Sequence, residues 1–419
     1  MFGIRNSVII KNSCLALVLI GNVVGMYMNQ YVSMSSWSNI VMIVAILGLI
    51  NWGNLLGGKF PLFNPKMKLI LFFQIACIIY YYFFPAWGDA SYSMYYSKYL
   101  YYHVFLIFMI FAVSSNDITI RINIDIFAVT TWILTTICSA FFLYSITHGM
   151  LFTMYADLDT LNVDWRDQIL EPITMCNACS LNIIASLFLP KFKFSNIVVV
   201  ASIILDINLI VFTGKRTPLF VAFVAILFYF IKTKAYKSFF SGKSFSFFIV
   251  AIIAAVVVFS TNETLGDRAL ETLERFFNGI YDFLNGTQTS GESASARYEF
   301  RKWATDYINN DFTFLNYIFG GGYMVKFLDA PLLQAYLDEG IWGVCIYVWA
   351  IFLLPLKYIK NITTDNKLMF LGCLICCQQF TSLFAHNQYE FGTWVPAILL
   401  LFFESIVKSQ ANMMYEKKN

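Results

Sequence analysis

Apolar runs of about 20 residues, the length that an α-helix needs to cross a bilayer, recur along almost the whole chain. The composition agrees, because 59% of the residues are hydrophobic and only 13% are charged, whereas soluble domains carry about 25% charged residues. We therefore predict an all-α, polytopic integral membrane helix bundle of about twelve transmembrane helices. The predicted spans lie near residues 12–27, 38–56, 68–86, 100–115, 126–147, 173–190, 194–212, 217–231, 244–260, 330–356, 368–385 and 393–407.

Basic residues in short loops predict the orientation of these spans, since they concentrate on the cytoplasmic side of a membrane. Of the 28 Lys and Arg residues, eighteen lie in one set of alternate loops and termini, and six lie in the long polar segment 261–329. The opposite set holds only four, which are Lys98, Arg166, Lys215 and Arg216. Both termini are therefore predicted to be cytoplasmic and segment 261–329 external.

This orientation divides the chain into three parts. Residues 1–260 hold predicted spans 1–9, residues 261–329 form the large external loop, and residues 330–419 hold spans 10–12 and a cytoplasmic tail. No internal repeat is evident, so an inverted-repeat transporter gains no support from the sequence.

Several classes of site and partner gain no support from the sequence. The net charge of +3 is small and the cations cluster at membrane edges, so nucleic acid is not an expected partner. Cys176 and Cys179 have the spacing of a redox pair, but no second ligand pair follows, so we interpret them as small apolar helix residues. We predict no metal and no cofactor.

One short external turn, Gly214–Pro218, runs against the charge pattern because it holds Lys215 and Arg216 between two apolar runs. One interpretation is a solvated turn, with Pro218 opening the next helix. The interpretation that we favour is an anion site. Arginine binds phosphate through two parallel hydrogen bonds, and the N-terminus of the following helix adds partial positive charge.

The external loop contains two predicted helices, separated by a small polar stretch over 285–295. Residues 263–284 have an amphipathic pattern. Residues 296–310 include Arg297 and Arg301, which are four positions apart and so project from one helix face. A solvated helix with Arg–Glu pairs explains this spacing as well as a functional site does.

After these helices the chain passes a glycine-rich turn, "FGGGY", and re-enters the predicted membrane region. Gly321, within the turn, permits close backbone approach. Asp329 lies at the predicted external mouth. Asp338 and Glu339 lie two to three helical turns deeper, where acidic groups are costly and often functional.

These external groups together predict a site for an anionic head group carried by a lipid. A diphosphate fits, because cationic side chains could hold it and stabilise it as it departs. Asp329 is our candidate for the base that takes a proton from an attacking hydroxyl, with His386 as a second candidate, although a lone His is usually a hydrogen-bonded interface residue. Tyr323, Trp303 and Tyr389 could stack on sugar rings. The predicted reaction is glycosyl transfer outside the membrane, without a nucleotide sugar or a metal.

Three stretches resemble the O-antigen polymerases (Wzy-type) and the related O-antigen ligases. "TGKRTP" is similar to the family's turn of a small residue, Gly, any residue and Arg. The loop with Arg297, Arg301 and "FGGGY" is similar to the family's Arg-containing helix and Gly-rich turn, and "LDAPLLQAYLDEGIWGV" is similar to the helix that follows. The resemblance covers about half of the chain, roughly residues 200–400, and its motifs are loose.

The resemblance implies a bacterial inner-membrane glycosyltransferase that moves a growing glycan from undecaprenyl diphosphate onto a new lipid-linked repeat unit at the periplasmic face. It implies that Arg216, Arg297 and Arg301 contact the diphosphate or the sugar. The implied partners are undecaprenyl-diphosphate-linked oligosaccharide, membrane lipid and a chain-length regulator protein. To these contacts we add further substrate-binding candidates, which are Lys215, Gly321, Tyr323 and His386.

Three alternatives stay open: an O-antigen ligase, a transporter, and a membrane sensor or scaffold, which would depend on none of these residues. Ligases usually carry His-Asn just before the post-loop helix, where this chain has Leu328 and Asp329, so the polymerase is favoured. A flippase or other transporter of lipid-linked oligosaccharides would place charged residues inside the bundle. Within the predicted spans such residues are few, with Asp206 and Glu404 standing out.

Overall fold

The structure of the chain is a computed structural model. It describes residues 6–31, 37–86, 93–117, 124–147, 172–189, 195–213, 216–234, 291–328, 330–356 and 388–416, together with the short pieces 270, 274, 277–278, 372–374 and 377. At several helix ends, including Arg216 and Arg297, it describes the backbone alone.

Regular secondary structure in these residues is helical, apart from one isolated β-bridge, so the all-α prediction is confirmed. The N-terminal helices are α1 (Asn6–Tyr31), α2 (Trp37–Leu49), α3 (Trp52–Leu56), α4 (Met67–Phe83), α5 (Ser93–Ser114), α6 (Ile124–Thr147), α8 (Pro172–Ser186), α9 (Ser195–Thr213) and α10 (Arg216–Thr233). The later helices are α14 (Gly291–Asp311), α15 (Phe314–Phe319), α16 (Pro331–Val348), which continues as a π-helical turn over Trp349–Leu353, and α19 (Phe391–Glu416).

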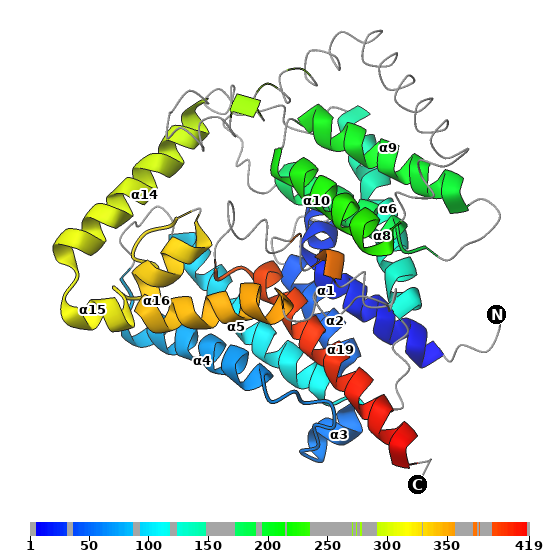
Figure 1. The fold of residues 1–419 in the computed structure, drawn as a ribbon, viewed down its shortest axis with the longest axis horizontal. Helices are drawn as coiled ribbons and strands as arrows, with labels where there is room; N and C mark the ends of the chain where they lie inside the picture. Colours follow the sequence, from blue (N-terminus) through cyan, green and yellow to red (C-terminus); the bar gives the residue numbers. More distant parts are fainter. Residues whose placement is uncertain are drawn as a thin grey trace.

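The helices form two packing groups that share α1 (Figure 1). In the first group α2, α4, α5, α16 and α19 surround an apolar core that includes Phe73, Trp394 and Phe402. In the second group α6, α8, α9 and α10 surround a smaller core with Phe142 and Ile210. α14 lies at the edge of the first group and packs on α16.

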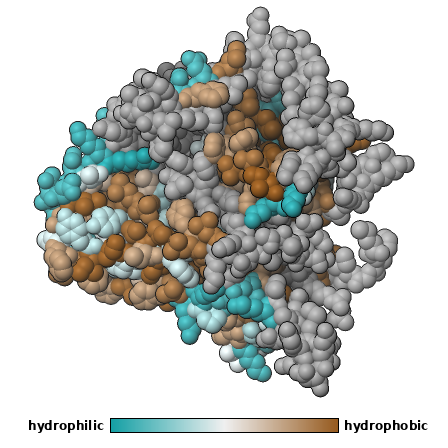
Figure 2. All heavy atoms as spheres, in the orientation of Figure 1, coloured by the Kyte–Doolittle hydropathy of each residue, from teal (hydrophilic) through white to brown (hydrophobic). Residues whose placement is uncertain are grey.

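Large apolar side chains also face outward from these helices. On α4 the side chains of Leu69, Phe72, Ile79 and Phe83 are exposed, and their three- to seven-residue spacing places them on one helix face. Figure 2 shows an extended apolar surface over the region of α4 and α16. Within the described residues two helical segments, Ile126–Ser145 and Pro331–Leu356, are long and apolar enough to cross a membrane, and seven shorter apolar helices accompany them.

Helices occupy the predicted spans that fall in the described residues, but two of these spans are interrupted, the one over 330–356 at Gly340 and the one over 38–56. The span predicted over 38–56 is broken, because α2 ends at Leu49 and α3 begins at Trp52. Asn51 causes the break: its backbone N–H donates to Ser115 Oγ at 3.0 Å, and its side chain caps α3.

Three predicted segments cannot be compared in this way. The span over 244–260 lies outside the described residues, as do most of the span over 368–385 and most of the amphipathic helix over 263–284. The helix predicted over 296–310 is present and forms the greater part of α14.

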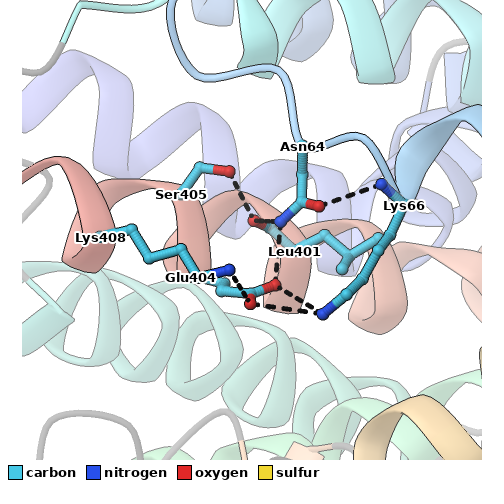
Figure 3. Close-up of polar contacts among 6 residues, drawn as sticks. All are labelled: Asn64, Lys66, Leu401, Glu404, Ser405 and Lys408. Carbon is cyan, nitrogen blue, oxygen red and sulfur yellow. Dashed lines mark hydrogen bonds and ion pairs between the residues drawn. The ribbon is translucent and has the colours of Figure 1, made fainter.

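A polar clasp attaches α19 to the turn before α4 (Figure 3). Glu404 on α19 accepts a hydrogen bond from Asn64 Nδ2 at 2.9 Å and lies between two lysines, Lys66 at 3.3 Å and Lys408 at 2.7 Å. Asn64 Nδ2 also donates to the Leu401 carbonyl at 3.2 Å. The clasp therefore satisfies a carboxylate that is only 10% exposed at the end of the bundle.

Candidate functional site

The candidate site lies where α16 is interrupted at Gly340. This glycine has φ 71° and ψ −156°, which divides α16 into a first half that ends at Glu339 and a second half that begins at Ile341. The last carbonyls of the first half are bound by the glycine-rich turn: Gly321 N–H donates to Leu337 O at 2.8 Å, and Gly322 N–H donates to Asp338 O at 3.2 Å. The turn thus satisfies backbone groups that a helix end would otherwise leave unpaired.

The three glycines of the turn are explained by this close approach. Gly320 and Gly322 have φ values of 78° and 113°, a region that L side chains rarely adopt. A Cβ at Gly320 would overlap the Asp338 carbonyl, and one at Gly322 would lie 2.7 Å from the Phe84 carbonyl. The backbone approach predicted for this turn is therefore present, and its partners are the broken α16 and the end of α4.

The turn is tied to α4 by the isolated β-bridge between Pro85 and Tyr323. Tyr323 N–H donates to Phe84 O at 2.8 Å, and Ala86 N–H donates to Tyr323 O at 3.1 Å. The Tyr323 side chain points into the bundle and is fully buried. The ring therefore presents no face to solvent on which a sugar could stack.

Asp338 and Glu339, at the end of the first half of α16, are both 0% exposed. Asp338 accepts hydrogen bonds from Val325 N–H at 3.0 Å, from Gln334 Nε2 at 2.6 Å and from the Tyr389 hydroxyl at 2.8 Å. Val325 belongs to the segment that follows the glycine-rich turn, so Asp338 connects that segment to the helix break.

Glu339 shares the tyrosine partner of Asp338. It lies 2.5 Å from the Tyr389 hydroxyl and accepts a bond from Gln388 Nε2, also at 2.5 Å. Cys77 of α4 lies 4.0 Å from the same carboxyl group. Where side chains are described, no lysine or arginine is paired with either acid.

A second polar layer lies beside the two acids. His103 Nδ1 is 2.6 Å from Gln74 Oε1, and His103 Nε2 is 3.2 Å from the Tyr323 hydroxyl. Because a carbonyl oxygen only accepts, this arrangement puts a proton on Nδ1, and in a neutral imidazole Nε2 then accepts from the phenol. Tyr323 in turn packs on Tyr389, with ring centroids 4.6 Å apart.

The two tyrosines at the site are neutral hydrogen-bond donors. Burial raises the pKa of the Tyr323 and Tyr389 phenols well above the ordinary value, and the neighbouring acidic groups raise the two pKa values further. Tyr389 therefore brings one proton, and only one, to its two carboxyl partners.

The arginine-bearing helix α14 is anchored on the same segment. Ala304 and Ile308 of α14 are buried against Val325, Leu328 and Leu337. Arg301, about two turns before Ile308 on the same helix, is partly exposed.

An aromatic cluster on α14 also involves a lysine from the segment after the turn. Trp303 and Tyr307 are stacked, with centroids 5.1 Å apart and an interplanar angle of 12°. Lys326 Nζ lies 4.4 Å from the Trp303 ring centroid and 5.1 Å from that of Phe300, at cation–π distance. In addition to the apolar packing of Ala304 and Ile308, this cluster therefore links α14 to the segment that precedes α16.

The structure describes the predicted site residues unequally. Gly321 and Tyr323 lie in the turn above the break in α16, and Arg301 lies on the helix beside it. Arg297 and Arg216 lie in α14 and at the start of α10, with only their backbones described. The remaining candidates, Asp329, Lys215 and His386, lie outside the described residues.

Several residues of the site were not among the predicted candidates. Asp338 and Glu339 carried a signal, namely two adjacent acids beside a glycine inside an apolar run. Gln74, His103 and Gln388 carried none, because they come from three distant segments and no local pattern joins them.

A separate polar cluster lies in the second packing group. Asp206 of α9 accepts from Ser139 Oγ at 2.6 Å and from Asn182 Nδ2 at 2.8 Å. Asn182 Oδ1 in turn accepts from Thr135 at 2.8 Å and Thr136 at 3.1 Å. These bonds join α6, α8 and α9 across their interface, as buried polar networks do when every member is satisfied.

In the part of the chain that the structure describes, no group of three or more His, Cys, Asp or Glu side chains could hold a metal ion. A scan against protein-family models, a search of characterised proteins and a search of solved structures all found no match to this chain.

Proposed function

We propose that this chain is a multi-pass protein of the bacterial inner membrane that polymerises lipid-linked oligosaccharide repeat units. It would transfer the growing glycan from undecaprenyl diphosphate onto a new lipid-linked repeat unit at the periplasmic face. The observation that carries this proposal is the packing of α14, with Arg297 and Arg301, on the segment that closes the break in α16.

The membrane setting is supported by the outward apolar faces. A monomeric soluble protein rarely exposes large continuous apolar patches, whereas α4 exposes a stripe of Leu, Ile and Phe side chains and the surface over α4 and α16 is apolar (Figure 2). Non-helical backbone at membrane depth is tolerated where it is buried in protein, and the break at Gly340 is fully buried.

The proposed chemistry needs positive charge for a departing diphosphate and a base for the attacking hydroxyl. α14, the helix that carries both arginines, packs through Ala304 and Ile308 on the apolar cluster at the start of α16. Asp329 stays our predicted base. The residues on either side of it, Leu328 and Ala330, are buried in the same apolar cluster as Ala304 of α14, which supports a base and an arginine helix attached to one scaffold.

A transporter of lipid-linked oligosaccharide is the second candidate, and one observation favours it. Asp206, Asp338 and Glu339 are all buried inside the helix bundle. Carboxyl groups in such positions often mark ion or proton pathways, so the bundle interior is more acidic than the sequence pattern alone indicated.

The gel pattern of surface polysaccharide distinguishes these candidates. A strain that lacks the protein is expected to show single repeat units in place of a ladder, because units still form and reach the surface but are not joined. A strain that shows no repeat units at all on its lipid core would instead support a ligase or a flippase.

The arginine helix is tested in the same assay with two neighbouring substitutions. Arg301→Ala is expected to reduce long chains at least about tenfold, since the loss of one donor to a developing anion typically costs about 100-fold or more in rate. Lys302→Ala, a charge removal at the adjacent exposed position, should leave the ladder intact. Equal ladders from both variants, at equal protein levels in the membrane, would remove Arg301 from the site.

A further inference from the structure

The break in α16 holds two adjacent acids for which the described side chains provide no cationic partner. Asp338 and Glu339 are fully buried, and two adjacent buried carboxylates without a cation are strongly disfavoured, although hydrogen-bond donors can stabilise one of them alone. Glu404 provides the contrast within this chain, because it lies between Lys66 and Lys408. Two negative charges at the break would therefore need compensation of another kind.

The hydrogen bonds around Tyr389 indicate what that compensation is. The phenol oxygen lies 2.8 Å from Asp338 Oδ2 and 2.5 Å from Glu339 Oε1. A phenol donates one proton, and carboxylates only accept. Two separate two-centre hydrogen bonds, each with its own proton, require one carboxyl group to carry a proton and donate it to the phenol oxygen.

The carboxamide of Gln388 also lies against the pair, because its Nε2 donates to Glu339 Oε2. Its Oε1 atom is buried and has no hydrogen-bond partner among the described residues. If the two ends of the carboxamide exchanged places, Oε1 would face Glu339 Oε2 and would accept from a protonated carboxyl group. This gives the same single proton a second position on Glu339.

We propose that Asp338 and Glu339 hold one proton between them, with the Tyr389 hydroxyl as the bridge, so that the break in α16 is a proton-binding site inside the bundle. This site is separate from the proposed glycan transfer and would exist whether the chain is a transferase or a transporter. Asp338 also accepts from Val325 N–H, so the proton state of the pair is coupled to the segment that holds α14. Loss of the proton would leave two like charges side by side beneath the glycine-rich turn.

The titratable groups that face the pair come from every element packed against it. They are Cys77 and Tyr80 on α4, Tyr99 and His103 on α5, Tyr323 in the glycine-rich turn and Tyr389 before α19. His103 is the only base among these groups, and its ring nitrogens contact Gln74 and Tyr323 and neither acid. They cannot replace the proton.

Infrared spectroscopy of the full-length protein in lipid nanodiscs tests the proposal. At neutral pH the wild-type spectrum should contain the carbonyl-stretch band of a protonated carboxylic acid. The frequency of this band should shift in heavy water, because the acid proton exchanges for deuterium. This band should disappear in Asp338→Asn and in Glu339→Gln, because a single remaining acid can ionise among its donors. Glu404→Gln, the acid paired with lysines, is the matched control and should leave the band in place.

Tyr389→Phe keeps both acids and provides a test that does not depend on either acid variant folding. Without the bridging hydroxyl the acid band should move in frequency. In the same nanodiscs the unfolding temperature of the wild type should fall as pH rises, because the folded protein holds a proton that the unfolded chain releases. The single-acid variants should show a flatter dependence.

Two results would overturn the proposal. One is a wild-type spectrum in this region identical to those of Asp338→Asn and Glu339→Gln, which would mean that both acids are ionised. The other is the loss of the acid band in sodium buffer, together with a higher unfolding temperature in sodium than in potassium. That result would mean that a metal ion, and not a proton, occupies the pair.

Discussion

Gly340 shows how one residue sets the geometry of the site. Its positive φ ends the first half of α16 immediately after the two acids, and its α-carbon faces the Ile318 carbonyl of α15. A larger residue here would need a left-handed backbone conformation and additional space. The break, the position of the acids and the packing of the glycine-rich turn therefore depend on this glycine.

Gly340→Ala is expected to destabilise the protein. The combination of φ 71° and ψ −156° is essentially restricted to glycine and costs about 1–3 kcal/mol for a residue with a Cβ, and the new Cβ would meet the Ile318 carbonyl at 2.5 Å. Gly392→Ala, in α19, is the control, because a Cβ there meets nothing within 4 Å. Thermal unfolding of both variants in lipid nanodiscs measures the two effects. Equal unfolding temperatures for the two variants would contradict this role for Gly340.

Single residues also show how far sequence reasoning reaches at the site. At the glycine-rich turn the sequence predicted close backbone approach or a tight turn, and the structure shows a close approach to α16 and to the end of α4. The partner in α16 was not predicted, since Gly340 inside an apolar run is equally compatible with a continuous helix. The buried layer of Gln74, His103 and Tyr323 depends on contacts between distant segments, and spacing along the chain contains no information about them.

At the level of elements, the helices followed from the apolar runs and the breaks did not. Spans near 68–86, 194–212 and 330–356 correspond to α4, α9 and α16. The division of the span over 38–56 depends on Asn51, whose hydrogen bond to Ser115 joins residues 64 positions apart. Hydropathy sums over a window and cannot detect such a partner.

The attachment of α19 gives a prediction about one element. Glu404→Ala removes the acceptor of Asn64 and leaves Lys66 and Lys408 without their shared carboxylate. We expect a loss of about 1–3 kcal/mol in the free energy of unfolding, the range for a broken bond to a charged group. Chemical unfolding of the wild type and the variant in mixed micelles measures this difference in free energy.

Lys408→Ala provides the comparison for this clasp. Lys408 is 66% exposed, and exposed ion pairs contribute about 0–1 kcal/mol. Lys408→Ala should reduce the free energy of unfolding less than Glu404→Ala does, because Lys66 and Asn64 still contact the carboxylate. A larger loss from Lys408→Ala would mean that the clasp depends on the exposed pair.

At the level of the whole molecule, two groups of helices share α1 (Figure 1), and each group contains a buried polar cluster, at the break in α16 and around Asp206. The arginine helix α14 and the break in α16 form one packed unit, whereas α10 with Arg216 belongs to the other group. If all three arginines act on one diphosphate, the ligand must reach from one packing group to the other.

Polymerisation by the purified protein tests the proposed function most directly. The full-length chain in nanodiscs would be incubated with lipid-linked repeat units extracted from the strain that lacks it, without nucleotide sugars or any other protein. We predict glycans of increasing length, with release of undecaprenyl diphosphate, and a strong reduction with Arg301→Ala but not with Lys302→Ala. Repeat units that stay single with the wild-type protein would contradict the proposal.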